Sequence, residues 1–124
     1  MGDATREAVL AALGAIRCDA ACTEEMLHAQ AARALEAAGI TAQHEARLAP
    51  RCRIDFLAGT IGIEIKKSRP RSGALLAQLR RYAACAQVTE LVVMAPRGVN
   101  LPRTIGGKRV TMLSLERLWG ISLP

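Results

Sequence analysis

The sequence predicts an α/β domain built around a mixed β-sheet, and three patterns indicate this fold class. Apolar residues recur at helical spacing through the first 38 residues, two runs of alternating character flank residues 59–60, and residues 90–95 form a largely apolar run. With 124 residues, the chain is long enough for one domain with one hydrophobic core. We therefore expect a single domain over residues 1–124, in which helices flank about five strands.

Two helices are expected before the sheet. Apolar residues spaced three and four apart within residues 5–17 predict the first helix. Thr23 is a suitable N-cap for the second, which is expected to run to Ala38, with Gly39 ending it in the left-handed conformation.

Strands dominate the rest of the chain, because β-branched and alternating segments are separated there by residues typical of turns. Pro70 and Gly73 mark a loop before a further amphipathic helix. The apolar run at residues 90–95 is typical of a strand covered on both faces. Strands are expected over residues 41–48, 51–58, 61–67, 90–95 and 109–113, a helix over 74–87 and a short helical tail over 115–119.

The dipeptide Gly-Thr at residues 59–60 predicts a β-hairpin with a type II′ turn, because Gly supplies the positive φ that the first turn position requires. If Ala58 pairs with Ile61 across this turn, Asp55 lies opposite Glu64. Side chains alternate between the two faces of each strand. The core face is then expected to carry Ile54, Phe56, Ala58, Ile61, Ile63 and Ile65, and the polar face Arg53, Asp55, Leu57, Gly62, Glu64 and Lys66.

Two facing carboxylates on this hairpin are expected to hold a divalent cation. Like charges directly opposite each other destabilise a sheet, and a hard cation between Asp55 and Glu64 would remove that repulsion. Lys66 lies on the same face, two residues after Glu64, and Gly62 is expected to leave room there for a ligand to approach. The alternative is an exposed face on which these acids pair with lysine and no metal binds.

Charge is unevenly distributed along the chain, and this favours a polyanionic partner. Residues 1–50 carry four basic and seven acidic side chains, whereas residues 51–124 carry thirteen basic and four acidic ones. A basic half on a compact domain indicates nucleic acid as the partner. The three aromatic residues are too few for a base-stacking platform of the kind that many single-strand binders use.

Neither a membrane protein nor an exported protein is expected from this composition. The longest apolar run, residues 8–16, is about half of what a bilayer span needs, and the acidic residues before it do not suit an export signal. The four cysteines, Cys18, Cys22, Cys52 and Cys85, lack the spacing of a zinc ribbon. We expect all four to be reduced, in a cytoplasmic protein.

The hairpin and the helix after it resemble the signature of a known family. Asp55, followed after eight residues by Glu64-Ile65-Lys66, resembles the motif of the PD-(D/E)XK nuclease superfamily. The segment Gln78-x-x-x-Tyr82 resembles the helix motif of the RecB-type members of that superfamily.

The resemblance implies a restriction-endonuclease-like fold over residues 23–115, with residues 1–22 as a helical extension. Ile54 stands where the motif of the family has a proline. No cysteine follows Cys85, so the iron–sulfur cluster that some RecB-type nucleases carry is not expected.

The resemblance also implies hydrolysis of DNA phosphodiester bonds by a metal-activated water, directed by DNA structure rather than by sequence. Asp55, Glu64 and the backbone carbonyl of Ile65 would hold Mg²⁺ or Mn²⁺, which lowers the pKa of a bound water. Lys66 would position that water or neutralise charge in the transition state. Gln78 would orient Lys66, the water or the substrate.

A further acidic residue is expected from the second helix. Glu24 is favoured over Glu25, because it lies three and seven residues before apolar positions and so shares the buried stripe. Glu45 would support the site through a water, or else pair with Arg47 or Arg53.

Other residues are expected to contact DNA or to pack beneath the site. Tyr82 would support Gln78 or contact the DNA, or else face the core. His28 is expected to be a partly exposed residue on the outer face of its helix, with Glu25. The expected phosphate contacts are Lys67, Arg69, Arg71, Arg80 and Arg81.

Two classes of function follow from the sequence. The first is a small metal-dependent nuclease that acts on DNA. The alternative is a non-catalytic module on the same fold that binds nucleic acid or a protein. A homodimer would pair two active sites, although the sequence identifies no interface.

Overall fold

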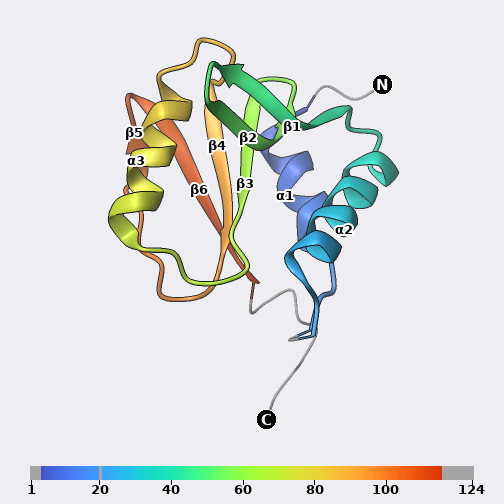
Figure 1. Cartoon of the computed structure of the whole chain (residues 1–124). Helices are drawn as coiled ribbons and strands as arrows, with labels where there is room; N and C mark the ends of the chain where they lie inside the picture. The colour runs from blue at the N-terminus through green and yellow to red at the C-terminus, as the bar shows by residue number, and fades with distance from the viewer. Residues whose placement is uncertain (1–3, 20, 116–124) are drawn as a thin grey trace.

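The computed structural model describes residues 4–19 and 21–115, which form three helices and one open six-stranded sheet (Figure 1). The helices are α1 (Arg6–Gly14), α2 (Glu24–Ala37) and α3 (Ser72–Ala83). The strands are β1 (Ala42–Ala49), β2 (Cys52–Ala58), β3 (Ile61–Ile65), β4 (Glu90–Ala95), β5 (Thr104–Ile105) and β6 (Lys108–Ser114). None of the described helices is long and apolar enough to cross a lipid bilayer.

The sheet is mixed and carries helices on both faces. Its strand order is β1-β2-β3-β4-β6-β5, in which β3, β4 and β6 run parallel and the other neighbouring pairs are antiparallel. α1 and α2 pack on one face, and α3 packs on the other (Figure 1). The predicted α/β class with a mixed sheet is therefore confirmed.

Packing on both faces explains why β4 is apolar along its length. Every residue from 91 to 95 is buried. Val92 and Met94 belong to the core beneath α1 and α2, whereas Leu91 and Val93 belong to the core beneath α3. The prediction of a strand covered on both faces is confirmed.

The predicted capping residues of α2 act as expected. Oγ1 of Thr23 accepts a hydrogen bond from the backbone N–H of Met26 at 3.0 Å, which satisfies one of the free donors at the start of the helix. Gly39 follows the last turn with a φ of 75°, in the left-handed region that favours glycine.

Three elements towards the C-terminus differ from the prediction or lie outside the described residues. The helix expected over residues 74–87 is α3, which ends earlier, at Ala83, because the following residues form the turn into β4. The short strand β5 was not predicted, although Gly106 and Gly107, both with positive φ, form the tight turn that joins it to β6. The tail expected over residues 115–119 lies, apart from Leu115, outside the described residues.

The prediction that all four cysteines are reduced is wrong, because Cys18 and Cys22 form a disulfide. Their Cα atoms lie 5.6 Å apart, within the range that a disulfide requires. Cys52 and Cys85 are free.

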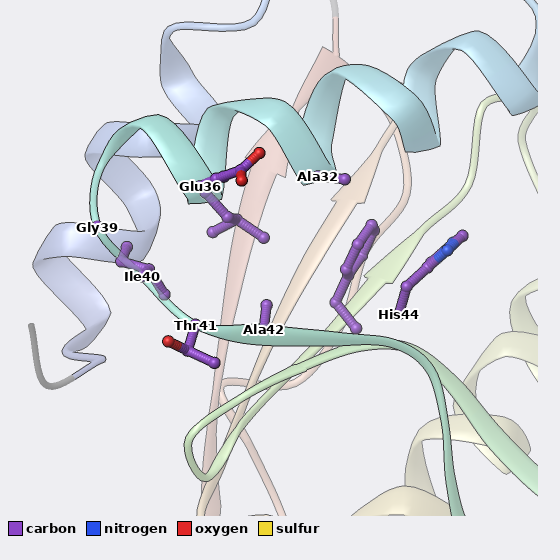
Figure 2. Close-up of a pocket in the computed structure, with 9 residues that line it drawn as sticks. Ala32, Glu36, Gly39, Ile40, Thr41, Ala42 and His44 are labelled. Carbon is purple, nitrogen blue, oxygen red and sulfur yellow. The ribbon is translucent and has the colours of Figure 1, made fainter.

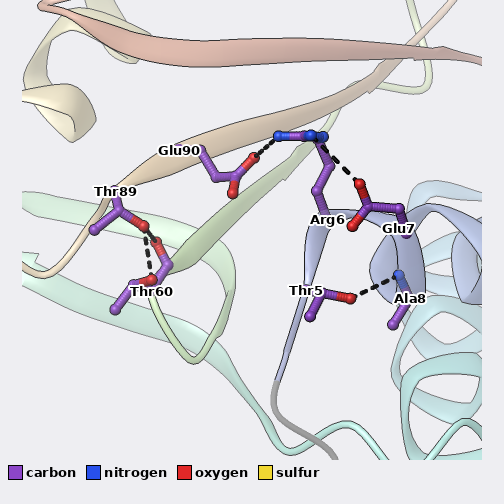
Figure 3. Close-up of polar contacts among 7 residues, drawn as sticks. All are labelled: Thr5, Arg6, Glu7, Ala8, Thr60, Thr89 and Glu90. Atoms are coloured by element: carbon purple, nitrogen blue, oxygen red, sulfur yellow. Dashed lines mark hydrogen bonds and ion pairs between the residues drawn. The ribbon is translucent and has the colours of Figure 1, made fainter.

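Polar contacts hold α1 and the β2–β3 turn against the start of β4 (Figure 3). Arg6 of α1 forms an ion pair with Glu90 at 3.3 Å. At the turn, the hydroxyl oxygens of Thr60 and Thr89 lie 2.7 Å apart. Gly59 has a φ of 62°, whereas Thr60 has no positive φ, which agrees with the predicted type II′ turn.

The predicted register of the hairpin holds next to the turn and fails towards the candidate site. The pairs from Ala58–Ile61 to Phe56–Ile63 form as predicted. Beyond them, Oδ2 of Asp55 accepts a hydrogen bond from the backbone N–H of Ile65 at 2.7 Å. The expected strand pair between Asp55 and Glu64 is therefore not part of the ladder, because a side-chain oxygen has replaced the backbone acceptor and the strands separate.

The alternation of side chains between faces breaks at Asp55. Phe56 and Ala58 pack beneath α1 and α2 as predicted, but Ile54 packs beneath α3. On the neighbouring strand β1, Glu45 lies opposite this break, between the pairs His44–Phe56 and Ala46–Ile54. It has a φ of 53°, which redirects the backbone of the paired strands. The prediction that Ile54 shares a face with Phe56 is therefore wrong.

Gly62 does not leave space for a ligand, contrary to the prediction. A Cβ atom at this position would lie 2.6 Å from Cδ1 of Ile54 and 3.0 Å from Cδ2 of Leu91. The side chain of Ile54 therefore fills the space that Gly62 leaves.

The substitution Gly62→Ala is expected to destabilise the protein by about 1–3 kcal/mol, because buried atoms of Ile54 and Leu91 must move to admit the methyl group. Chemical denaturation measures this loss. Gly73→Ala is the matched control in α3, where a new Cβ meets nothing within 4 Å and alanine favours the helix. Adding Ile54→Val removes Cδ1 and should recover part of the loss; a double variant no more stable than Gly62→Ala would show that this contact is not the cause.

Candidate functional site

The two carboxylates of the predicted motif lie where β2 and β3 separate. Asp55 comes from β2 and Glu64 from β3. Glu64 is only 3% exposed, and its Oε2 lies 3.1 Å from Nζ of Lys66. Its Oε1 is buried and has no hydrogen-bond partner among the described residues. Buried polar atoms without a partner are rare, since leaving one unsatisfied costs free energy.

Burial is the largest cause that raises the pKa values of both acids. Burial, and after it the negative charge of Asp55, raises the pKa of Glu64 from its usual 4.5 to about 7, against the opposing charge of Lys66. Burial likewise raises the pKa of Asp55, although the hydrogen bond from Ile65 opposes the change. A cation close to both groups would favour their charged forms and lower both pKa values.

Tyr82 of α3 packs beneath these residues and supports them. Its side chain is 2% exposed, and its hydroxyl donates a hydrogen bond to the backbone carbonyl of Arg53 at 3.0 Å. Burial, and then the nearby charge of Glu64, raises the pKa of Tyr82 above its usual value. Of the alternatives that the sequence left open for Tyr82, the structure shows the core-facing one.

His28 of α2 is partly exposed, as expected, but it faces the sheet rather than the outer side of the helix. Its side chain is 14% exposed, and its buried Nε2 lies 3.8 Å from Oδ2 of Asp55 and 3.9 Å from Oε2 of Glu24, without a hydrogen-bond partner among the described residues. The spacing in the sequence contained only part of the signal. His28 precedes the buried residues Ala31 and Leu35 by three and seven positions, so it borders the buried stripe of α2.

A cluster of rings fixes His28 against the sheet. Its Nδ1 lies 3.3 Å from Nε2 of His44, which belongs to β1. The ring of His44 stacks on Phe56 with 4.6 Å between centroids. These contacts direct the other nitrogen of His28 towards Asp55.

Glu24 lies nearer to the site than Glu25, but not for the predicted reason. Its side chain is 60% exposed rather than part of the buried stripe. It approaches His28, and its charge contributes to the raised pKa of Asp55 after the larger effect of burial. Glu25 forms no ion pair among the described residues.

α2 and the β1–β2 hairpin border a cavity of about 700 Å³ with a largely acidic lining. Its polar lining residues are Glu24, Glu25, His28, His44, Glu45 and Asp55. A hollow with this charge concentrates cations. A second cavity of about 480 Å³ lies between the end of α2 and the start of β1, and the two share Ala32 and His44 (Figure 2).

Two further predicted residues, Glu45 and Gln78, form no direct bond with the acids of the site among the described residues. Oε1 of Glu45 lies 3.8 Å from Nη1 of Arg53, which is one of the two pairings that the sequence left open. Gln78, one turn before Tyr82, is half-buried, and its side chain forms no hydrogen bond with the described residues. Its role in orienting Lys66 stays a prediction.

The predicted basic residues fall into two groups. Lys67, Arg69 and Arg71 lie between β3 and the start of α3, and Arg80 and Arg81 lie in the last turn of α3. Arg69 donates a hydrogen bond to the backbone carbonyl of Arg97 at 2.9 Å and packs over Gly98, so it joins two loops. The other four stay predicted phosphate contacts.

The donors at this site suit a cation that prefers oxygen. Within residues 4–19 and 21–115, no group of three or more His, Cys, Asp and Glu side chains is arranged to hold a metal ion. Asp55 and Glu64 supply two carboxylates, and the expected third oxygen is the backbone carbonyl of Ile65. The unpartnered oxygen of Glu64 fits such a ligand set.

No protein-family model, curated protein or solved structure gives a significant match to this chain.

Proposed function

We propose that this protein is a metal-dependent nuclease of the PD-(D/E)XK type, which hydrolyses phosphodiester bonds in DNA. The observation that carries the proposal is the side chain of Glu64. This residue is 3% exposed, and one of its carboxylate oxygens is buried without a hydrogen-bond partner among the described residues. Its carboxylate lies close enough to that of Asp55 for the charge of Asp55 to raise its pKa.

A buried carboxylate needs a compensating charge or hydrogen bond. Lys66 supplies one at Oε2 of Glu64, whereas Oε1 has none among the described residues. A divalent cation supplies such a charge and takes the oxygen donors that these residues offer.

The order of the elements supports a restriction-endonuclease-like fold. A helix precedes three antiparallel strands, and the next helix crosses over to a parallel strand. Asp55 lies on β2, Glu64 on β3, and Gln78 and Tyr82 on the crossover helix α3, which is the chain order that the family motif has.

Each residue of the motif has a distinct role in the proposal. Asp55, Glu64 and the carbonyl of Ile65 hold Mg²⁺ or Mn²⁺, which supplies a Lewis acid and lowers the pKa of a bound water. Lys66, now paired with Glu64, neutralises charge that develops on the phosphate. Gln78 orients Lys66 or the substrate.

The residues of α2 complete the proposed site from its other side. Glu24 and His28 approach Asp55 and line the acidic cavity, where they orient water beside the scissile phosphate. The DNA partner itself is proposed from the basic C-terminal half of the chain.

A cleavage panel of single-stranded, duplex and branched DNA, run with Mg²⁺ and with Mn²⁺, tests the proposal. The wild-type protein is expected to cut at least one substrate, and EDTA should abolish cutting. Lys66→Ala should slow cleavage by roughly 10²–10³-fold and retain DNA binding, because it removes charge stabilisation of the transition state. Arg103→Ala is the control, since it removes one positive charge from an exposed position next to β5.

The non-catalytic alternative predicts a different outcome. A wild-type protein that cuts none of these substrates with either metal would refute the proposed function. DNA binding that neither EDTA nor Asp55→Ala alters would then favour a binding module on the same fold.

Cytoplasmic location and homodimer formation stay predictions. The Cys18–Cys22 disulfide is unusual for the cytoplasm, where thiols are kept reduced. Mass determination of the protein purified with and without alkylation distinguishes the two redox states.

A further inference from the structure

Two arginines face each other on the β1–β2 hairpin, next to the candidate site. Arg47 pairs directly with Arg53 across the strands, which brings the Cβ atoms to roughly 4.5–5.5 Å. Their neighbours Ala46 and Ile54 are buried beneath α3, so the two exposed guanidinium groups lie on the opposite face of the hairpin. Like charges in this position destabilise a sheet.

The protein compensates these charges only weakly. Arg53 has Glu45 as an ion-pair partner at 3.8 Å, but the two side chains are 56% and 57% exposed, and such a pair contributes little in water. Arg47 forms no ion pair or hydrogen bond through its side chain with the described residues. An external anion would therefore relieve the repulsion.

Arg51 and Arg81 extend the basic surface around the tip of the hairpin. Arg51 occupies the turn between β1 and β2 with a φ of 61°. Together with Arg81 of α3, it lines a cavity of about 510 Å³ whose lining contains no acidic residue. We call Arg47, Arg51, Arg53 and Arg81 the arginine surface.

The arginine surface is tied to the candidate site through Arg53. The backbone carbonyl of Arg53 accepts the hydrogen bond from Tyr82, which lies beneath Glu64. Arg53 also precedes Asp55 by two residues, or about 6.8 Å along the strand. Its partner Glu45 lines the acidic cavity. Arg53 is therefore the member of the arginine surface that these contacts join to the candidate site.

We propose that the arginine surface binds backbone phosphates of the DNA strand that enters the Asp55–Glu64 site. The identity of the polyanion as DNA rests on the proposed function. All four cations are arginines, whose planar guanidinium groups bind phosphate oxygens in a bidentate manner. Closely spaced phosphates along one strand match the directly paired Arg47 and Arg53 better than the scattered carboxylates of an acidic protein do.

The experiment measures binding of labelled single-stranded and duplex DNA by fluorescence anisotropy, in EDTA and at several salt concentrations. Arg47→Gln/Arg53→Gln should weaken binding by about tenfold or more. It should also reduce the slope of log K against log salt by about 1.4 for single strands or 1.8 for duplex, as expected for two lost phosphate contacts. The melting temperature of this variant should not fall, because a repulsive pair is removed.

Arg103→Gln/Arg109→Gln is the matched control, since it removes the same charge from exposed positions at the β5–β6 edge. It should weaken binding less than about threefold. Equal weakening by the two double variants would overturn the proposal, because only net charge would then matter. Binding by the wild type that does not depend on salt, or binding of an acidic polypeptide in preference to DNA, would also overturn it.

The outcomes separate this proposal from the proposed function. If the wild type cuts no DNA but binds it through Arg47 and Arg53, the nuclease proposal fails and the arginine surface stands. If the wild type cuts DNA and Arg47→Gln/Arg53→Gln cuts with an unchanged KM, the arginine surface fails and the nuclease proposal stands.

Discussion

Glu64→Gln is expected to abolish DNA cleavage and, without divalent metal, to make the protein more stable above pH 7. Glutamine keeps the size of the side chain but never carries the charge that burial opposes at this position. It also lacks the carboxylate that the proposed cation requires. Glu64 would then be needed for function while lowering the stability of the fold, as residues of many catalytic sites do.

The pH dependence follows from the raised pKa of Glu64, about 7 in the folded protein against a usual 4.5. Below about pH 4.5 this group is protonated in both states. As the pH rises from 4.5 to 7, the unfolded chain releases the proton while the folded protein retains it, so the folded state loses stability. The loss is complete above about pH 7 and amounts to roughly 3 kcal/mol.

Urea denaturation in EDTA between pH 4.5 and pH 8 measures this effect. The wild type should lose stability across this range relative to Glu64→Gln. Glu36→Gln, which changes an exposed carboxyl on α2, is the control and should follow the wild type. Adding Mn²⁺ at pH 8 should raise the melting temperature of the wild type but not of Glu64→Gln. Equal stabilisation of both proteins by Mn²⁺, or a Glu64→Gln variant less stable than the wild type at pH 8, would contradict the prediction.

The sequence predicted the parts of the fold that local chemistry decides. Thr23 and Gly39 fixed the ends of α2 because a side-chain oxygen and a left-handed residue are needed there. Gly59 fixed the hairpin turn, and the turn fixed the register of the residues next to it. These signals act within a few residues and can be recognised without tertiary contacts.

The parts that were mispredicted depend on contacts between distant residues. Strict alternation placed Ile54 with Phe56, but Glu45 on the neighbouring strand adopts a positive φ and the alternation breaks. The same break lets the carboxylate of Asp55 replace a strand hydrogen bond, which the pairing rule does not anticipate. The sequence identified the candidate acids, but their arrangement required the structure.

His28 shows the same limit on the helical side. Its spacing placed it at the border between the buried and outer faces of α2, and the sequence favoured the outer face. The choice is decided by His44 and Phe56, two residues of the sheet whose rings pack with the imidazole. No property of α2 alone contains that information.

Asp55→Ala and Asp55→Asn are expected to lose cleavage equally but to differ in stability. Both substitutions remove the carboxylate that the proposed cation requires. Asparagine keeps an oxygen that accepts the N–H of Ile65, whereas alanine leaves this N–H without an acceptor in a residue that is 1% exposed. A buried donor left unpaired costs about 1–3 kcal/mol, so Asp55→Ala should be less stable than Asp55→Asn by that amount.

Amide hydrogen exchange at Ile65 identifies the cause of this difference. Exchange should be faster in Asp55→Ala than in Asp55→Asn, because only the asparagine still closes the gap between β2 and β3. Asp19 offers a matched control, since its Oδ1 also accepts a backbone N–H, from Ala21 at 3.0 Å, but at an exposed position where water can replace it. The difference between Asp19→Ala and Asp19→Asn should therefore be small. Equal stability of the two Asp55 variants would show that the hydrogen bond to Ile65 does not hold the strands, and cleavage by Asp55→Asn would remove Asp55 from the proposed set of metal ligands.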